Sequence, residues 1–268
     1  MLEKKLSFGL TPCPNDTFIF YQFLKNPFIE GQFHDIEVLN ELAFQKALPL
    51  IKVSCATAVK LQDYIILSAG GAMGYDCGPI LISNFLNHAE TWEDLYTSKI
   101  YIPGRHTTAN FLFHQFSKEN KIPFEKLSIH YVRYDQILPL LVNNQERAYG
   151  ILIHEERFTY KKHSLNLVLD LGEWWYKEKN LPIPLGCIVL HQEYHAYKEF
   201  IEDKIRESLL YSQNHYFEVL DFMKKHAQTM DEDAIKNHVN LYVTKFSYDV
   251  GVDGWNAIQM LKTFINQS

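Results

Sequence analysis

The stretch Lys99-Ile-Tyr-Ile-Pro-Gly-Arg-His-Thr-Thr-Ala109 decides the fold of this 268-residue chain. It starts as a short run of isoleucine and tyrosine, passes through a Pro-Gly turn and enters an apolar helical pattern, so it predicts a strand at 99–102 and a helix at 106–118. Strand patterns at 128–133 and 148–153 follow, with a helix at 135–143 between them. Strands joined by helix-length crossovers are typical of a parallel sheet. The sequence therefore predicts a parallel βαβαβ unit.

The segments on either side of this unit predict a second α/β lobe. Expected strands lie at 6–10, 36–39, 51–54, 64–67, 78–83 and 187–190, and a further strand at 165–169 follows the βαβαβ unit in its own lobe. Helices are expected at 15–25, where Asn15 is a plausible N-cap, and at 41–48. From residue 192 onward the pattern is nearly all helical.

These patterns predict an α/β protein of two lobes with the chain crossing between them near residue 90 and again near residue 184. The larger lobe would be discontinuous, formed by 1–92 plus 186–268, and the smaller lobe would be formed by 93–185. This arrangement predicts a ligand cleft between the lobes, where pockets are common.

Composition narrows the class of partner. The formal net charge is −6 and the chain has no tract of lysine and arginine, which argues against nucleic acid as a partner, since phosphate binding needs a basic surface. No apolar run approaches the roughly 20 residues that span a bilayer. Prolines 12 and 14, with Asn15 and Asp16, interrupt any signal-like segment. We expect a cytoplasmic protein that acts on a small organic molecule.

Cysteine and histidine give no metal motif. The four cysteines are widely scattered and form no Cys-x-x-Cys pair, so reduced and partly buried thiols are expected. None of the 12 histidines belongs to a His-Glu-x-x-His pattern.

His154 is the leading candidate for a catalytic base. It ends the buried apolar run Gly150-Ile-Leu-Ile-His154, and the carboxyl ends of strands in open α/β sheets are where ligands bind. A neutral imidazole accepts a proton near physiological pH. Glu155 and Glu156 are candidates to orient the ring.

Two further segments are candidate binding sites. Thr107 and Thr108 are expected at a helix N-terminus, where hydroxyl and free N–H groups bind a carboxylate or phosphate, unless Thr107 only caps the helix. Lys52 and Ser54 close an earlier strand and offer a charge and a hydroxyl, although a capping and turn role is the alternative.

The glycine-rich stretch 69–79 lacks both the dinucleotide-binding and the P-loop pattern. It is expected to let the backbone approach a flat ligand or another strand, with Asp76 in a solvated turn. The pair Trp174 and Trp175 is more typical of core packing than of a ligand site.

The chain closely resembles the 1,4-dihydroxy-6-naphthoate synthase family of the futalosine menaquinone pathway. The motifs that carry the resemblance run nearly end to end: Thr11-Pro-Cys-Pro-Asn-Asp-Thr-Phe-Ile-Phe20, Pro103-Gly-Arg-His-Thr-Thr-Ala109, Arg133-Tyr-Asp-Gln-Ile-Leu-Pro139, Ile153-His-Glu-Glu-Arg-Phe-Thr-Tyr160, Leu171-Gly-Glu-Trp-Trp175, Leu181-Pro-Ile-Pro-Leu-Gly186 and Phe246-Ser-Tyr-Asp-Val-Gly251. It implies a fold similar to type II periplasmic binding proteins and a carbon–carbon lyase that acts on cyclic dehypoxanthine futalosine, a carboxylate, without a metal or organic cofactor.

The resemblance also implies roles for individual residues. His154 matches the family's proton acceptor, and the matching substrate-contacting segments are Lys52-Val53-Ser54 and Thr107-Thr108. The chain departs from the pattern at Cys55, where relatives tend to have an aromatic residue. Two alternatives are the related chorismate dehydratase, which the run around His154 disfavours, and a carboxylate-binding protein without catalytic activity, which would be expected to carry an export signal.

Overall fold

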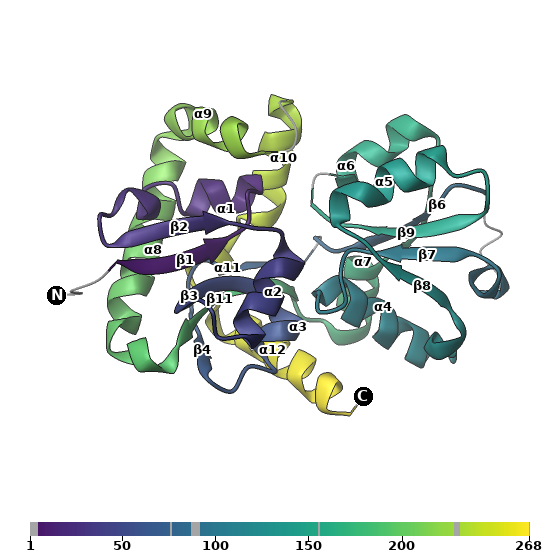
Figure 1. The fold of residues 1–268 in the computed structure, drawn as a ribbon, viewed down its shortest axis with the longest axis horizontal. Coiled ribbons are helices and arrows are strands. Elements are labelled where there is room, and N and C mark those ends of the chain that lie inside the picture. The colour runs from purple at the N-terminus through teal and green to yellow at the C-terminus, as the bar shows by residue number, and fades with distance from the viewer. Residues whose placement is uncertain (1–4, 76, 87–91, 155, 228–230, 268) are drawn as a thin grey trace. The chain divides into compact units, whose positions relative to one another are not determined.

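The computed structural model describes residues 5–75, 77–86, 92–154, 156–227 and 231–267, and they form two compact units. Unit 1 consists of Met1–Gly74 and Pro184–Ser268, and unit 2 of Tyr75–Ile183 (Figure 1). The predicted first boundary, after residue 92, is too late, because strand β6 (Ile80–Ser83) pairs with two strands of unit 2. Residues 87–91, where the first crossing was expected, lie outside the described part of the chain.

Unit 1 contains a six-stranded mixed sheet. Its strands are β1 (Leu6–Leu10), β2 (Ile29–Phe33), β3 (Leu50–Ser54), β4 (Tyr64–Ile66), β5 (Ala72–Gly74) and β11 (Ile183–His191). The strand order is β2-β1-β3-β11-β4, and β5 pairs with β11. β1 runs parallel to β2 and β3, whereas β11 runs antiparallel to β3 and β4. The sheet is thus completed by a strand from the second half of the chain.

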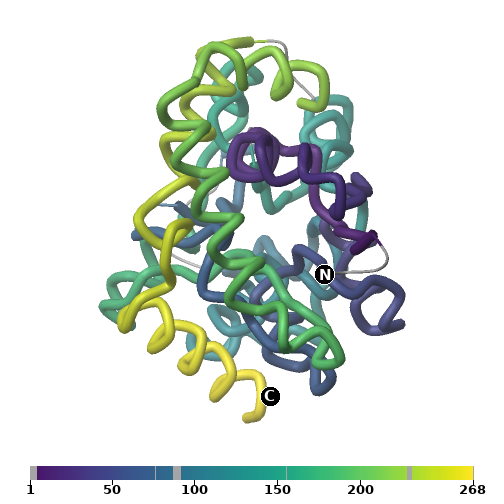
Figure 2. Tube along the Cα trace, turned by 90° about the vertical axis from the view of Figure 1, so that its left-hand side faces the viewer, coloured from purple at the N-terminus to yellow at the C-terminus, as the bar shows by residue number. Residues whose placement is uncertain are grey.

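The helices of unit 1 also come from both ends of the chain. They are α1 (Pro14–Ile19), α2 (Ile36–Phe44), α3 (Cys55–Ala58), α8 (Lys198–Asn214), α9 (Tyr216–His226), α10 (Glu232–Tyr242), α11 (Lys245–Tyr248) and α12 (Gly251–Asn266), with short 3-10 helices at Phe23–Lys25 and Gln192–Tyr197. α1 packs against α8, α9 and α10, and Figure 2 shows the purple N-terminal segment beside the green C-terminal helices.

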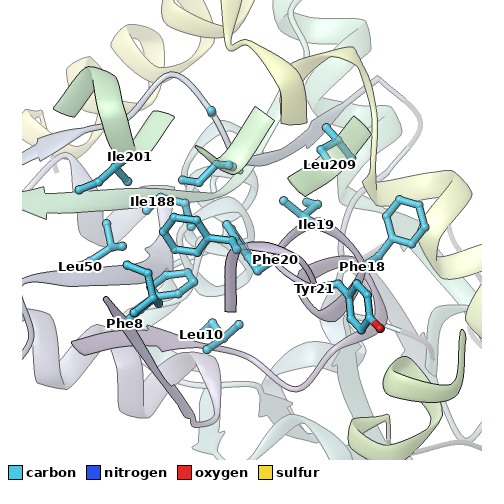
Figure 3. Packing of buried hydrophobic residues seen from close by; sticks show 14 of the residues in the cluster. Phe8, Leu10, Phe18, Ile19, Phe20, Tyr21, Leu50, Ile188, Ile201 and Leu209 are labelled. Atoms are coloured by element: carbon cyan, nitrogen blue, oxygen red, sulfur yellow. The ribbon is translucent and has the colours of Figure 1, made fainter. Parts of the chain in front are cut away.

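One apolar core joins these distant segments. Phe8 on β1 meets Phe20, just after α1, in an edge-to-face contact with ring centroids 4.9 Å apart. Ile188 of β11 and Ile201 of α8 belong to the same buried cluster (Figure 3). Burial of aromatic and aliphatic surface of this kind is the main stabilising contribution to folding.

Two predictions for unit 1 are corrected, and one strand was missed. Residues 36–39, predicted as a strand, begin α2, because Asp35 caps the helix by accepting a hydrogen bond from Glu37 N and the buried positions have helical spacing. Strand β2 was not predicted. Helix α1 starts at Pro14 with Cys13 at the N-cap, so Asn15 lies inside the helix and is not its cap.

Unit 2 contains a five-stranded sheet of order β10-β6-β9-β7-β8. The strands not yet given are β7 (Lys99–Ile102), β8 (Ser128–Tyr131), β9 (Ala148–Leu152) and β10 (Asn166–Asp170). β7 runs parallel to both β8 and β9, which confirms the predicted βαβαβ unit, and β6 runs antiparallel to β9. The helices are α4 (Thr108–Glu119), α5 (Tyr134–Asn143), α6 (Glu156–Thr159) and α7 (Leu171–Lys179), with 3-10 helices at Glu93–Tyr96, Phe124–Lys126 and Tyr160–His163.

Within the described ranges, no helix has both the length and the apolar character required to cross a membrane.

Candidate functional site

His154 lies in the turn that follows β9, two residues after the strand ends. Its backbone is left-handed, with φ of 56°, a conformation that is uncommon for a residue with a side chain. The ring is half-buried and packs edge-to-face on Tyr134, the first residue of α5, with centroids 4.7 Å apart. The side chain therefore lies beyond the carboxyl end of a strand, as the sequence predicts.

The residues that follow His154 are tied to the rest of unit 2 by Arg157. Its Nη1 donates to the carbonyl oxygen of Gly78 at 2.5 Å and its Nη2 donates to Asp170 Oδ2 at 2.6 Å. Only 15% of the arginine side chain and 16% of the aspartate side chain are exposed. Of the two predicted partners for the histidine, Glu156 is buried at the start of α6 and Glu155 lies outside the described residues.

Thr107 and Thr108 are both buried at the N-terminus of α4, as predicted. Thr107 is the N-cap: its hydroxyl accepts from Asn110 N at 3.2 Å and donates to Gly104 O at 3.0 Å. Both hydrogen-bonding roles of that hydroxyl are thus used within the helix start. What this helix start offers an anion is the Thr108 hydroxyl, the backbone N–H groups of the first turn and the positive dipole end of a 12-residue helix.

In unit 1, Lys52, Val53 and Ser54 lie on β3, and all three are buried. Ser54 is held by Asn40 of α2 through two hydrogen bonds. Ser54 N donates to Asn40 Oδ1 at 2.9 Å, and Asn40 Nδ2 donates to Ser54 Oγ at 3.1 Å. Ser54 therefore keeps its hydroxyl hydrogen as a donor with a fixed oxygen position.

Lys52 forms a buried ion pair with Asp16 of α1. The Lys52 Nζ donates to Asp16 Oδ1, and their side chains are 5% and 0% exposed. The sequence treated Lys52 as a free charge for a ligand, whereas the structure shows that its charge is already balanced.

Cys55, at the start of α3, faces Cys187 of β11 through a hydrogen bond between the two thiols. Complete burial, followed by this hydrogen bond, raises the pKa of the Cys55 thiol well above its usual value. All four cysteines are buried and carry reduced thiols. Cys55 is thus an unreactive, buried thiol next to Ser54.

The glycine-rich stretch lets the backbone approach another strand, which was one of its two predicted roles, because a Cβ at Gly71 would lie 3.2 Å from Gly186 O of β11. It also approaches the start of helix α7 closely. A side chain at Gly78 would place its Cβ 2.4 Å from Gly172 Cα. Trp175 is fully buried and donates to Pro182 O at 3.1 Å, while Trp174 packs on Phe116, so this pair serves packing. Asp76 lies outside the described residues.

The part of the chain that the structure describes contains no group of three or more histidine, cysteine, aspartate or glutamate side chains that could hold a metal ion.

Sequence reasoning missed three buried polar residues of unit 1, namely Asp16, Asn40 and His238. Asp16 carried the clearest signal, because it lies in the Thr11–Phe20 motif of the family resemblance. Asn40 is a polar side chain on the buried, otherwise apolar face of α2, and His238 contacts Asn15 across a sequence separation of 223 residues, which no local pattern reveals.

Comparison with known proteins identifies relatives over the whole chain. A family model described as menaquinone biosynthesis matches residues 6–267. The chain is 38% identical over 263 residues to a 1,4-dihydroxy-6-naphtoate synthase of Thermus thermophilus, covering 96% of this chain and 92% of the relative. It is 32% identical over 270 residues to the protein of the same name from Streptomyces coelicolor, with 98% and 93% covered.

Solved structures agree on the fold. Protein AF1704 from Archaeoglobus fulgidus matches with a TM-score of 0.88 and 27% identity, covering 100% of this chain and 98% of that one. The periplasmic aliphatic sulphonate-binding protein SsuA from Escherichia coli matches with a TM-score of 0.69, covering 98% and 87%. At 9% identity, the second likeness shows the fold alone. The fold is that of periplasmic binding proteins.

Proposed function

The chain belongs to the menaquinone biosynthesis family, and we propose that its predicted site residues carry out the reaction of a 1,4-dihydroxy-6-naphthoate synthase. The observation that carries this proposal is the identity of 38% to a synthase of that name over 96% of the chain. The protein is therefore an enzyme of menaquinone biosynthesis.

The proposed reaction is the cleavage of cyclic dehypoxanthine futalosine by a carbon–carbon lyase, which frees 1,4-dihydroxy-6-naphthoate and a sugar-derived remnant. We propose that the enzyme acts in the cytoplasm and that it uses no metal or organic cofactor. Aromatisation of the released ring supplies the driving force, so the protein has to orient the substrate, exclude water and move a proton.

His154 is the proposed general base, which removes a proton from the sugar-derived part of the substrate. Its left-handed backbone supports this role, because an uncommon backbone conformation in a turn is a feature that functional sites retain. Tyr134 fixes one edge of the ring, and Arg157 holds the segment that follows. A positioned general base accelerates a reaction by about 10²- to 10⁴-fold.

The substrate carboxylate is assigned to the N-terminus of α4. The Thr108 hydroxyl, the backbone N–H groups at the helix start and the helix dipole favour an anion there, and no positively charged residue is needed. Lys52, Val53 and Ser54 of unit 1 are assigned to the uncharged part of the substrate. Because Asp16 balances the charge of Lys52, we assign Lys52 a hydrogen-bonding role toward the substrate and not the binding of its carboxylate.

The test of the base is His154→Ala, assayed with purified cyclic dehypoxanthine futalosine. We expect the kcat to fall by about 10²-fold or more. His163→Ala is the matched control, since this exposed histidine lies in the same unit. Turnover by the His154 variant within a few fold of the wild type would disprove the assignment.

The test of the carboxylate anchor has to separate binding from helix capping. Thr108→Val should raise KM, while Thr107→Ser keeps a hydroxyl cap and should leave the fold and KM close to the wild type. An unchanged KM in Thr108→Val would place the carboxylate elsewhere. Incubation with chorismate instead, followed by mass spectrometry, tests the related dehydratase activity; only the cyclic substrate is expected to yield a product.

A further inference from the structure

We propose that Asp16 is a positioning residue that holds the Lys52 ammonium in place for the substrate. This inference rests on the proposed function, because it assumes that Lys52 contacts cyclic dehypoxanthine futalosine. Asp16 itself is completely buried, so it acts on the substrate only through Lys52.

The Asp16 carboxylate receives four hydrogen bonds from its surroundings. Oδ2 accepts from Thr11 Oγ1 at 2.7 Å and from Thr11 N at 3.2 Å. Oδ1 accepts from Asn15 Nδ2 at 2.8 Å and from Lys52 Nζ. Three of the donors belong to the segment Thr11–Asp16 and fix the carboxylate, so the fourth, on β3, is placed by it.

A helix from the other end of the chain supports this arrangement. His238 of α10 is fully buried, and its Nε2 lies 2.9 Å from Asn15 Oδ1. Since the Asn15 amide nitrogen donates to Asp16, its oxygen is the acceptor, and His238 Nε2 therefore carries the hydrogen. The chain of hydrogen bonds from His238 through Asn15 and Asp16 ends at Lys52.

Stability alone does not account for this pair. A buried ion pair gives little net stability compared with apolar residues of similar volume, because two charges have to be removed from water. Lys52 also lies two residues before Ser54 on β3, and the Ser54 hydroxyl is fixed independently by Asn40. Unit 1 thus places an ammonium and a hydroxyl on the same strand, each held by its own partner.

The test compares Asp16→Asn, Lys52→Met and the double variant Asp16→Asn/Lys52→Met in the full-length enzyme. Asp231→Asn is the matched control, because this exposed residue caps α10 and asparagine caps a helix as well as aspartate does. For each variant we would measure kcat and KM with cyclic dehypoxanthine futalosine. We would also measure the rate at which an amine-reactive reagent modifies Lys52, located by peptide mass spectrometry.

We expect KM of Asp16→Asn to rise by about 10- to 100-fold, the loss of one hydrogen bond to a charged group, with kcat within a few fold of the wild type. A merely structural role would reduce the active fraction, which lowers kcat and leaves KM unchanged. The double variant should have the same KM as Lys52→Met, because Asp16 has no function without the lysine. Asp231→Asn should match the wild type.

A KM of Asp16→Asn close to that of the wild type, or a further tenfold rise in KM from Lys52→Met to the double variant, would overturn the proposal. If Asp16→Asn does not fold, the comparison of Lys52→Met with the double variant decides, because the double variant leaves no charge buried alone and Lys52→Met leaves an Asp16 carboxylate that still accepts three hydrogen bonds. If the wild type does not turn over the substrate, the proposed function fails. The modification rate of Lys52 then tests whether Asp16 holds its ammonium in place. Faster modification in Asp16→Asn supports this role of Asp16, and an unchanged rate refutes it.

Discussion

Replacement of Arg157 by methionine tests how much the turn after His154 depends on one side chain. Methionine keeps the apolar stem and removes the guanidinium, which leaves the Asp170 carboxylate and the Gly78 carbonyl without that donor. Breaking a fully buried ion pair costs about 3–5 kcal/mol, and a hydrogen bond to a charged group contributes about 1.5–3 kcal/mol. With side chains 15% and 16% exposed, we expect Arg157→Met to lower the free energy of unfolding by about 2–4 kcal/mol.

Arg133→Met is a control with the same contact distance and different burial. Arg133 pairs with Asp135 at 2.6 Å, but 57% of its side chain is exposed, so its loss should cost about 0.5 kcal/mol. Both pairs lie in unit 2, and three of the four tryptophans, Trp92, Trp174 and Trp175, belong to that unit. Urea unfolding followed by tryptophan fluorescence therefore reports chiefly on the unit that carries both substitutions.

A double variant isolates the electrostatic part of the effect. Asp170 also caps α7, accepting from Gly172 N at 2.9 Å and Glu173 N at 3.1 Å, and asparagine preserves this role. Arg157→Met/Asp170→Asn should therefore be more stable than Arg157→Met alone. Equal losses of stability in Arg157→Met and Arg133→Met would show that burial does not determine the contribution of these pairs and would refute the reasoning.

Three further predictions concern packing, thiol reactivity and pH. Gly78→Ala should lower the free energy of unfolding by about 2–3 kcal/mol, because its methyl group would collide with backbone atoms. Gly31→Ala should cost less, because the one atom in its way is the end of the flexible Leu24 side chain; urea unfolding measures both. Cys55 should resist alkylation by iodoacetamide in the native protein at pH 8 and react after unfolding, as mass spectrometry would show, because burial raises the pKa of its thiol. Burial lowers the pKa of His114 in the folded protein, so as the pH falls the imidazole is protonated first in the unfolded chain. The free energy of unfolding should therefore fall as the pH drops through about 6.5. Unfolding measured from pH 7.5 to 5 should show a steeper fall in the wild type than in His114→Gln.

The sequence predicts unit 2 better than unit 1, and the reason is locality. The βαβαβ unit consists of elements that follow one another along the chain, from β7 through α4, β8 and α5 to β9. Its strands pair with each other, so the local periodicity of each segment is enough to predict it. Residues 36–39 have the β-branched composition of a strand, but the Asp35 cap and the packing of α2 on β3 decide for a helix. The order of the unit 1 sheet depends on β11, whose pairing with β3 joins residues more than 130 positions apart.

The candidate site shows the same limit at the level of single residues. His154 and Thr107 were predictable because strand ends and helix starts have local signatures, and the structure places both there. The state of Lys52 was not predictable, because its partner Asp16 comes from another element and burial alone fixes the pair. Composition shows that a lysine is present, and only the tertiary structure shows that its charge is balanced.

The interleaving of the two ends of the chain in unit 1 has a consequence for synthesis on the ribosome. Unit 2 is one continuous segment, Tyr75–Ile183, so it can fold while the remaining residues are still being translated. Unit 1 cannot, because Phe8, Phe20 and Leu50 find their apolar partners on β11, α8 and the helices after them. The first 74 residues are made first and finish folding last, and until then their apolar side chains and strand edges are those that a chaperone would need to protect.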